Sequence, residues 1–174
     1  MLKALLLAQL LFAAASARAE DAAVSEQALK AVLFYKLPLF VYSAGSDRRS
    51  QIGICALGDA PLGNAADKLP DTLADGRRVN FLVLSGVAAA ADCEFVFIGR
   101  SEAGRLDALL RTLNGRRVVT VSDIDGFARA GGMVEFSLRR DGSGVLILIN
   151  RKAAQKQGIE FNAQLLRLSR IIEP

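Results

Sequence analysis

Short apolar runs alternate with longer segments of mixed polarity through the middle of the chain. Four runs are rich in aliphatic and aromatic residues and have the length of a buried strand: residues 51–58, 77–84, 93–99 and 116–123. The segments between them have the composition of helices: residues 59–76, 85–92 and 101–115. Strands that alternate with helices in this way predict an α/β fold, in which helices cover both faces of a mostly parallel sheet.

Residues at the ends of these segments support the helix assignments. Pro61 lies near the first turn of one predicted helix and Gly76 lies just past its end. Ser101 is a candidate N-cap for the helix in residues 101–115, and Gly115 follows its last turn.

Residues 24–42 show apolar side chains at helical spacing. Pro38 falls inside this pattern, so we expect the helix to bend or end near Leu37. Core packing explains the aromatic residues of this segment better than a ligand or partner surface does. These residues are Phe34, Tyr35, Phe40 and Tyr42.

The C-terminal third departs from the strand–helix alternation. Residues 133–140 alternate, with Val134, Phe136 and Leu138 on one face and Glu135, Ser137 and Arg139 on the other, which predicts a strand with two different faces. A DGSG turn and the apolar run 145–150 complete an antiparallel hairpin. Asn150 should cap a helix that Gly158 ends, and a last helix should cover residues 162–172. We therefore predict one three-layer α/β domain, with about six mostly parallel strands and a C-terminal antiparallel hairpin.

The first 19 residues have the layout of a secretory signal peptide. Lys3 precedes an apolar run from Ala4 to Ala15, and Ala17 and Ala19 fit the positions before a cleavage site. The alternatives are a buried N-terminal helix or a membrane span, but a span needs about 20 apolar residues. We predict a signal peptide over residues 1–19 and an exported domain over residues 20–174.

The charge pattern argues against nucleic acid as a partner. The 174-residue chain has a formal charge of +4, and cleavage after residue 19 would remove Lys3 and Arg18, leaving +2. The remaining basic residues form scattered doublets instead of one concentrated basic face.

Motifs that carry chemistry are missing from the sequence. The chain has no histidine, and it lacks the GxGxxG, P-loop and GxSxG patterns. Asp123 and Asp125 resemble the start of a calcium loop, but the later ligands are missing and a polar turn explains them better. We predict no catalytic residues, no metal site and no cofactor, and keep an exported enzyme of unknown type as the third hypothesis.

Two cysteines remain in the predicted exported part of the chain. An even number in an oxidising compartment favours a disulfide between Cys55 and Cys93, and the alternative is two buried free thiols. Neither belongs to a CxxC motif, so a redox-catalytic role is not expected.

Several segments, in order and spacing, resemble the YfiR family of exported bacterial proteins. The matching segments are LKAVLFY in the first helix, the cysteine before EFVFIG and its partner in the first strand, VVTVSDIDGF, GGMVEF, VLILIN, AA, and GIEFNAQLLRLSRII. The resemblance covers about residues 24–172. One departure stands out, because the family's first helix runs into a Trp-Pro pair. Here the stretch reads LPLFVYSAG, the proline is Pro38, and the chain has no tryptophan.

The resemblance implies a periplasmic regulator rather than an enzyme. Such a protein binds an inner-membrane signalling protein, either a diguanylate cyclase or a sensor kinase. It holds a cyclase inactive until redox state or an outer-membrane lipoprotein relieves the inhibition, which raises cyclic di-GMP and promotes biofilm. Relatives of this kind form homodimers. A regulator needs a partner surface, and we expect it at Phe127, Glu135 and Arg139. The alternative function is a small-molecule sensor with its ligand near Gly58 and Gly99.

Overall fold

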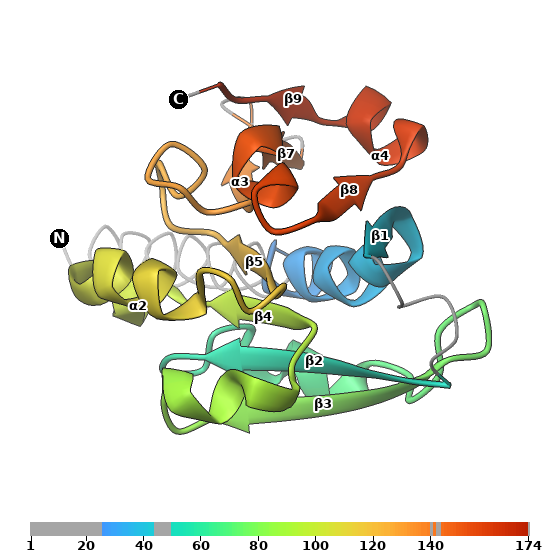
Figure 1. Cartoon of the computed structure of the whole chain (residues 1–174). Helices are drawn as coiled ribbons and strands as arrows, with labels where there is room; N and C mark the ends of the chain where they lie inside the picture. The colour runs from blue at the N-terminus through green and yellow to red at the C-terminus, as the bar shows by residue number, and fades with distance from the viewer. Residues whose placement is uncertain (1–25, 44–49, 140, 142–143, 174) are drawn as a thin grey trace, which may run out of the picture.

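The computed structural model describes residues 26–43, 50–139, 141 and 144–173. Its main feature is a seven-stranded sheet of order β3-β2-β4-β5-β6-β7-β9 (Figure 1). In that spatial order the strands are β3 (Arg78–Leu84), β2 (Gln51–Leu57), β4 (Phe95–Ile98), β5 (Val119–Ser122), β6 (Val134–Leu138), β7 (Val145–Ile149) and β9 (Arg170–Ile171). The first five are mutually parallel, β7 is antiparallel to β6, and β9 is parallel to β7. The predicted α/β class and the C-terminal hairpin are confirmed, with seven strands instead of about six.

Each face of the sheet has its own hydrophobic core. On β2, Ile52, Ile54 and Ala56 belong to one buried cluster, while Cys55 and Leu57 belong to the other. This division follows from the two-residue period of a strand, which sends successive side chains to opposite faces. The first cluster contains residues of the helix over residues 26–36, and the second contains residues of α2 (Leu106–Leu113).

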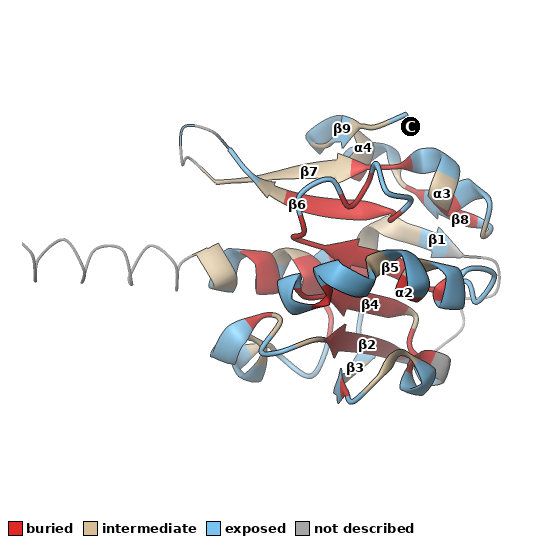
Figure 2. Cartoon of the chain, turned by 90° about the vertical axis from the view of Figure 1, so that its left-hand side faces the viewer, coloured by how far each residue is buried: buried red, intermediate tan, exposed pale blue. Residues whose placement is uncertain are grey.

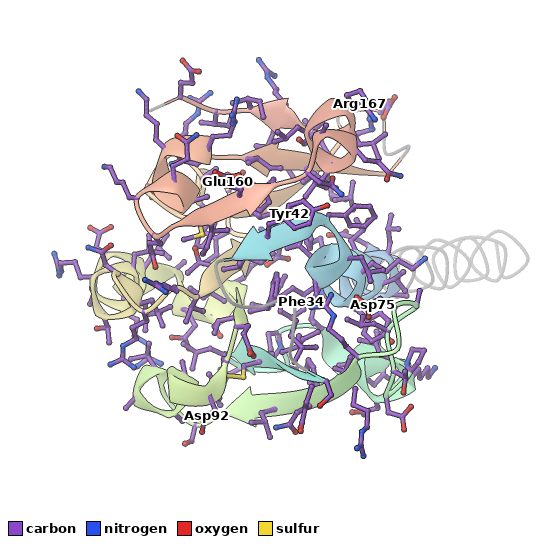
Figure 3. The ribbon with its side chains drawn as sticks, turned by 45° about the vertical axis from the view of Figure 1, so that its right-hand side comes forward. Phe34, Tyr42, Asp75, Asp92, Glu160 and Arg167 are labelled. Atoms are coloured by element: carbon purple, nitrogen blue, oxygen red, sulfur yellow. A yellow bond between two sulfur atoms is a disulfide. The ribbon has the colours of Figure 1, made fainter. Side chains whose placement is uncertain are left out.

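Aromatic rings fill the first core. Phe34 reaches from the first helix to Phe97 of β4, with ring centroids 5.4 Å apart in an edge-to-face arrangement, and Figure 3 shows it in the molecule's interior. Tyr35 is also buried and Phe40 is half-buried, which agrees with core packing. Tyr42 is different, because its side chain is 56% exposed and lies beside Glu160 across a strand pair.

The first helix ends where the proline predicts. Helical hydrogen bonding stops at Lys36, and a 3₁₀ turn, η1 (Leu37–Phe40), begins with Pro38 in its first turn. The chain then forms β1 (Val41–Ser43), which pairs antiparallel with β8 (Ile159–Phe161) as a separate two-stranded sheet. This second sheet was not predicted.

A polar junction holds the segment after η3 (Gly63–Lys68) against the first helix. The Tyr35 hydroxyl donates a hydrogen bond to the carbonyl oxygen of Thr72 at 2.6 Å. Burial raises the pKa of Tyr35 above its ordinary value, and the carboxylates of Asp71 and Asp75 raise it further. Hydrogen bonding to the Arg77 guanidinium lowers the pKa of Asp75.

The helix predicted over residues 59–76 is wrong. The segment forms only η3, after which Leu69 is extended at φ −75° and ψ 143°. Pro70 explains this break, because its ring disfavours helical geometry at the preceding residue. Residues 85–92 form a short 3₁₀ helix, η4 (Val87–Asp92).

The predicted helix over residues 101–115 is also divided. It begins as the 3₁₀ segment η5 (Arg100–Arg105) and continues as α2. Ser101 does not cap it, because its hydroxyl accepts a hydrogen bond from the Asp59 backbone N–H at 2.9 Å. Gly115 does follow the last turn, with φ +79°.

Both C-terminal helices begin at an asparagine cap. The Asn150 carboxamide oxygen accepts from the Ala153 N–H at 3.0 Å and starts α3 (Arg151–Gln155). Asn162 accepts from the Leu165 N–H in the same way and starts α4 (Ala163–Leu168). The last helix is shorter than predicted, because the following residues leave it to form β9 and pair with the end of β7.

The predicted signal peptide, residues 1–19, lies outside the described residues. In the part of the chain that is described, no helix combines the length and apolar character needed to cross a membrane.

Candidate functional site

A disulfide links Cys55 to Cys93, as predicted, with their Cα atoms 5.9 Å apart. Cys55 lies within β2 and Cys93 lies between η4 and β4, and Figure 3 shows the sulfur–sulfur bond between these elements. Both side chains are buried in the core on the α2 face of the sheet. The bridge closes a sequence separation of 38 residues, for which chain entropy predicts a stabilisation of about 4 kcal/mol.

The turns at Gly58 and Gly99, expected to border a ligand, are closely packed instead. A Cβ added to Gly58 would lie 2.6 Å from the Ser101 hydroxyl oxygen. A Cβ added to Gly99 would lie 2.9 Å from the Pro61 Cβ. Ser101 and Pro61 therefore occupy the space next to these glycines.

The loop between β5 and β6, residues 123–133, is a closely packed connection that contains or contacts two of the predicted partner residues, Phe127 and Glu135. We call it the β5–β6 loop. Phe127 has no exposed surface, and its ring fills the core beneath the loop. Gly132 lies directly against that ring, where an added Cβ would overlap three of its carbons. Phe127 therefore supports the loop from inside and does not form an outer surface, contrary to our expectation.

Glu135 anchors the same loop. Its carboxylate accepts hydrogen bonds from the Gly126 N–H at 3.1 Å and the Ala128 N–H at 2.9 Å, and its side chain is 3% exposed. The predicted alternation along β6 is present near its start, where Glu135 faces away from Phe136. The error lay in taking the polar face to be the outer face, because the β5–β6 loop covers it.

Two further buried side chains hold the loop in place. The Asn150 carboxamide donates to the Ala128 carbonyl oxygen at 2.8 Å while its oxygen caps α3. The Thr120 hydroxyl accepts from the Met133 N–H at 3.1 Å. The segments VVTVSDIDGF, GGMVEF and VLILIN thus meet at one loop, although they are separate in the sequence. These segments carry the family resemblance through their order and spacing, which does not indicate that they contact one another.

A buried ion cluster ties the start of this loop to the first helix. Lys30 is 1% exposed, and its ammonium nitrogen lies 2.7 Å from a carboxylate oxygen of Asp123 and in contact with Glu26. Arg100 approaches the same Asp123 oxygen at 3.2 Å and also pairs with the exposed Asp125. Lys30 was not among the predicted site residues, although a lysine among apolar helix positions is the signal that could have identified it.

Asp123 and Asp125 therefore serve as ion-pair partners. Among the described residues, no group of three or more histidine, cysteine, aspartate or glutamate side chains could hold a metal ion.

A cleft of about 410 Å³ opens beside the β5–β6 loop, between α2 and α3. Asp107, Leu110, Arg111 and Asn114 contribute one side, and Lys152, Ala153, Lys156 and Gln157 contribute the opposite side. Thr120, Asn150, Ala130 and Gly131 complete the lining, so the residues that fix the loop also shape the cleft. We call it the α2–α3 cleft. The sequence did not reveal it, because its two sides lie about 40 residues apart along the chain.

Arg139 lies apart from the loop, at the far end of the hairpin. The hairpin of β6 and β7 projects beyond the rest of the sheet (Figure 2). Arg139 is exposed there, and the adjacent Leu138 is 48% exposed although the alternation placed it on the buried face. The three residues expected to form one partner surface are thus divided, with Phe127 and Glu135 buried together and Arg139 outside.

Comparisons with known proteins identify the family and the fold. The profile of a family described as YfiR/HmsC-like matches residues 27–170. Of solved structures, an ABC domain from Streptococcus pneumoniae in complex with L-Trp is similar, with a TM-score of 0.55 and 13% identity over 84% of this chain. A conserved domain protein from Vibrio cholerae O1 biovar El Tor is similar with a TM-score of 0.53 and 14% identity over 85% of this chain. The chain spans 60% of the length of each, and at these identities the likeness concerns the fold alone. No curated protein matches by sequence.

Proposed function

The chain belongs to the YfiR/HmsC-like family, and we propose that it is an exported protein that binds and represses an inner-membrane diguanylate cyclase. The family consists of periplasmic regulators of diguanylate cyclase signalling rather than enzymes. The family match over residues 27–170 is the observation that carries the proposal. Residues 1–19 would direct export and then be cleaved off, and repression would lower cyclic di-GMP and biofilm formation.

The end of the β6–β7 hairpin is our candidate for the partner surface. Arg139 provides a positive charge there, and Leu138 provides an exposed apolar side chain beside it. Residues 145–148 of β7 are only half-buried, which adds apolar surface along the same projecting hairpin (Figure 2). A central apolar contact with a charged rim is the usual composition of a protein interface. Glu135 and Phe127 would contribute indirectly, by fixing the loop at the base of β6.

Co-purification from the native host tests this proposal. Tagged protein is recovered from periplasm and detergent-solubilised membranes, and cellular cyclic di-GMP is measured in parallel. We expect wild-type protein to recover a membrane cyclase and to lower cyclic di-GMP relative to a deletion strain. Recovery of no membrane signalling protein would contradict the proposal, and recovery of a sensor kinase would replace the cyclase as the partner.

Paired variants locate the surface. Leu138→Asp should abolish recovery of the partner and raise cyclic di-GMP, because it places a charge at the centre of the proposed contact. Val83→Asp is the matched control, since Val83 is 67% exposed on β3 at the opposite edge of the sheet. Equal effects of the two substitutions would remove the hairpin from the proposal while leaving repression itself in place.

We extend the proposal to redox control through the disulfide. Both cysteines are buried, so reduction requires local opening of the fold and would act by removing about 4 kcal/mol of stability. Thiol titration of periplasmic protein should find no free thiol before denaturation in reductant, whereas two free thiols would end the redox proposal. Cys55→Ser should lower stability and weaken repression together.

Two further partners are part of the proposal. An outer-membrane lipoprotein would relieve the repression, and its deletion should leave cyclic di-GMP permanently low. A homodimer would present two hairpins to the cyclase. Light scattering of the purified protein distinguishes a dimer from a monomer directly.

A further inference from the structure

The α2–α3 cleft carries an excess of positive charge. Arg111 comes from α2, and Lys152 and Lys156 come from α3 and the turn after it. Asp107 is the one carboxylate among the described residues of the lining, so the charged residues of the cleft sum to +2. Within the described residues, no carboxylate lies within ion-pair distance of any of the three cations. Three cations that converge on one cleft with a single carboxylate beside them favour an anionic occupant.

A buried polar atom at the same cleft also lacks a partner. The Gln157 carboxamide oxygen is buried and accepts no hydrogen bond from the described residues. An unsatisfied buried acceptor costs about 1–3 kcal/mol, which favours a small turn of the Gln157 side chain toward the cleft, where a ligand can donate to its oxygen. Thr120 also lines the cleft. Its hydroxyl oxygen accepts a hydrogen bond from the Met133 N–H, which leaves its hydroxyl proton free to be donated to a ligand.

We propose that the α2–α3 cleft binds a small, multiply charged anion that also carries a hydroxyl group, such as a phosphorylated polyol or a hydroxy polycarboxylate. Arg111, Lys152 and Lys156 neutralise the phosphate or carboxylate groups, and the ligand hydroxyl donates to Gln157. A volume of about 410 Å³ suits a molecule of this size. The cleft lining does not include Leu138 or Arg139 at the projecting end of the β6–β7 hairpin, so the site is separate from the proposed partner surface and goes beyond the proposed function.

The cleft is preorganised on the side of the β5–β6 loop. Ala130 and Gly131 form part of its lining, and the loop that carries them is held by Glu135, Asn150 and the packed ring of Phe127. Asn150 lines the cleft and starts α3 as well, which fixes the helix that presents Lys152. Rigid walls reduce the entropy lost when a small ligand binds.

Isothermal titration calorimetry on purified protein tests the site with four probes: glycerol 3-phosphate, citrate, inorganic phosphate and glycerol. Glycerol is the uncharged control, and inorganic phosphate lacks the carbon-bound hydroxyl. We expect glycerol 3-phosphate or citrate to bind more tightly than inorganic phosphate, and glycerol not to bind. The two hydroxylated anions distinguish a phosphate ligand from a carboxylate ligand.

Three variants separate the cleft from general surface charge. Lys152→Gln combined with Lys156→Gln should weaken anion binding at least about tenfold, because two charge-assisted contacts are lost. Arg167→Gln combined with Arg170→Gln removes the same charge from exposed positions outside the cleft and should leave binding unchanged. Gln157→Leu should erase the preference for hydroxylated anions over inorganic phosphate.

Two results would overturn the site. Absence of measurable binding by all three anions to the wild-type protein would do so. Equal weakening in both double variants would do so as well, because it would show attraction by net charge alone. Neither result bears on partner recovery, so failure of this site and failure of the regulatory proposal are distinguishable.

Discussion

Replacing Gly132 by alanine should destabilise the protein through the ring of Phe127 and not through the backbone. Gly132 does not have a positive φ, so alanine can adopt its conformation. The new methyl group would instead overlap three ring carbons, and the ring has no exposed side toward which it can move. Overpacking of this kind in a filled core costs about 1–3 kcal/mol.

A double-mutant cycle isolates this contact. Phe127→Leu alone should cost roughly 1–2 kcal/mol, because it leaves a small cavity under the loop. Phe127→Leu also removes the ring that an alanine at position 132 would overlap. The double variant should therefore lose about 1–2 kcal/mol less stability than the sum of the losses in the two single variants. Urea unfolding followed by circular dichroism under oxidising conditions measures each free energy of unfolding.

Gly131→Ala is the matched control for this cycle. Gly131 has φ +106° and no atom within 4 Å of an added Cβ, so its substitution introduces backbone strain without overlap. Its cost should add to that of Phe127→Leu. The reasoning fails if Gly132→Ala stays within about 0.5 kcal/mol of wild type, or if both glycine substitutions couple equally to Phe127→Leu.

Three further predictions concern buried polar groups. Lys30→Met should cost about 3–5 kcal/mol by leaving the Asp123 carboxylate buried without its main partner. Adding Asp123→Asn should recover most of that loss in the same unfolding assay, whereas no recovery would mean that the ion pair is not the cause. Glu135→Gln should lower the free energy of unfolding by about 1–3 kcal/mol. The carboxamide replaces one accepting oxygen with an NH₂ group, which then faces a backbone N–H group with which it cannot hydrogen-bond. Glu160→Gln, at an exposed carboxylate, should change the free energy little. Burial raises the pKa of Tyr35, so the stability that its neutral form contributes is complete below the ordinary tyrosine pKa and is lost as the pH rises through the raised pKa. Tyr35→Phe should therefore flatten the alkaline limb of a stability–pH curve, and an unchanged limb would assign that loss to another group.

The strands were predictable from the sequence because their apolar runs are short, continuous and separated by turn residues. The 3₁₀ segments were not, since local composition such as that of residues 63–68 suits an α-helix until Pro70 interrupts it. β1 and β8 have three residues each, which is too short for any period to be visible.

The site was predicted less well than the fold because exposure depends on the whole molecule. A polar residue on a strand, such as Glu135, is normally read as facing solvent. The loop that buries it directly precedes its strand and folds back over it, which no periodicity indicates. The disulfide was the exception, since a count of two cysteines leaves one possible intramolecular pair. The α2–α3 cleft depends on side chains from separate elements and could not be inferred from any one segment.

The β1–β8 pair has a consequence for the order in which the chain folds. Val41 finds its strand partner at Phe161, and Lys30 finds Asp123 at a separation of 93 residues. The N-terminal segment therefore completes its native contacts only after most of the chain has been synthesised. Non-local contacts of this kind slow folding because the loop must close before they form. In the export proposed above, a chain whose N-terminal segment completes its contacts last would keep that segment unfolded until its final residues arrive, which suits passage through a narrow translocation channel.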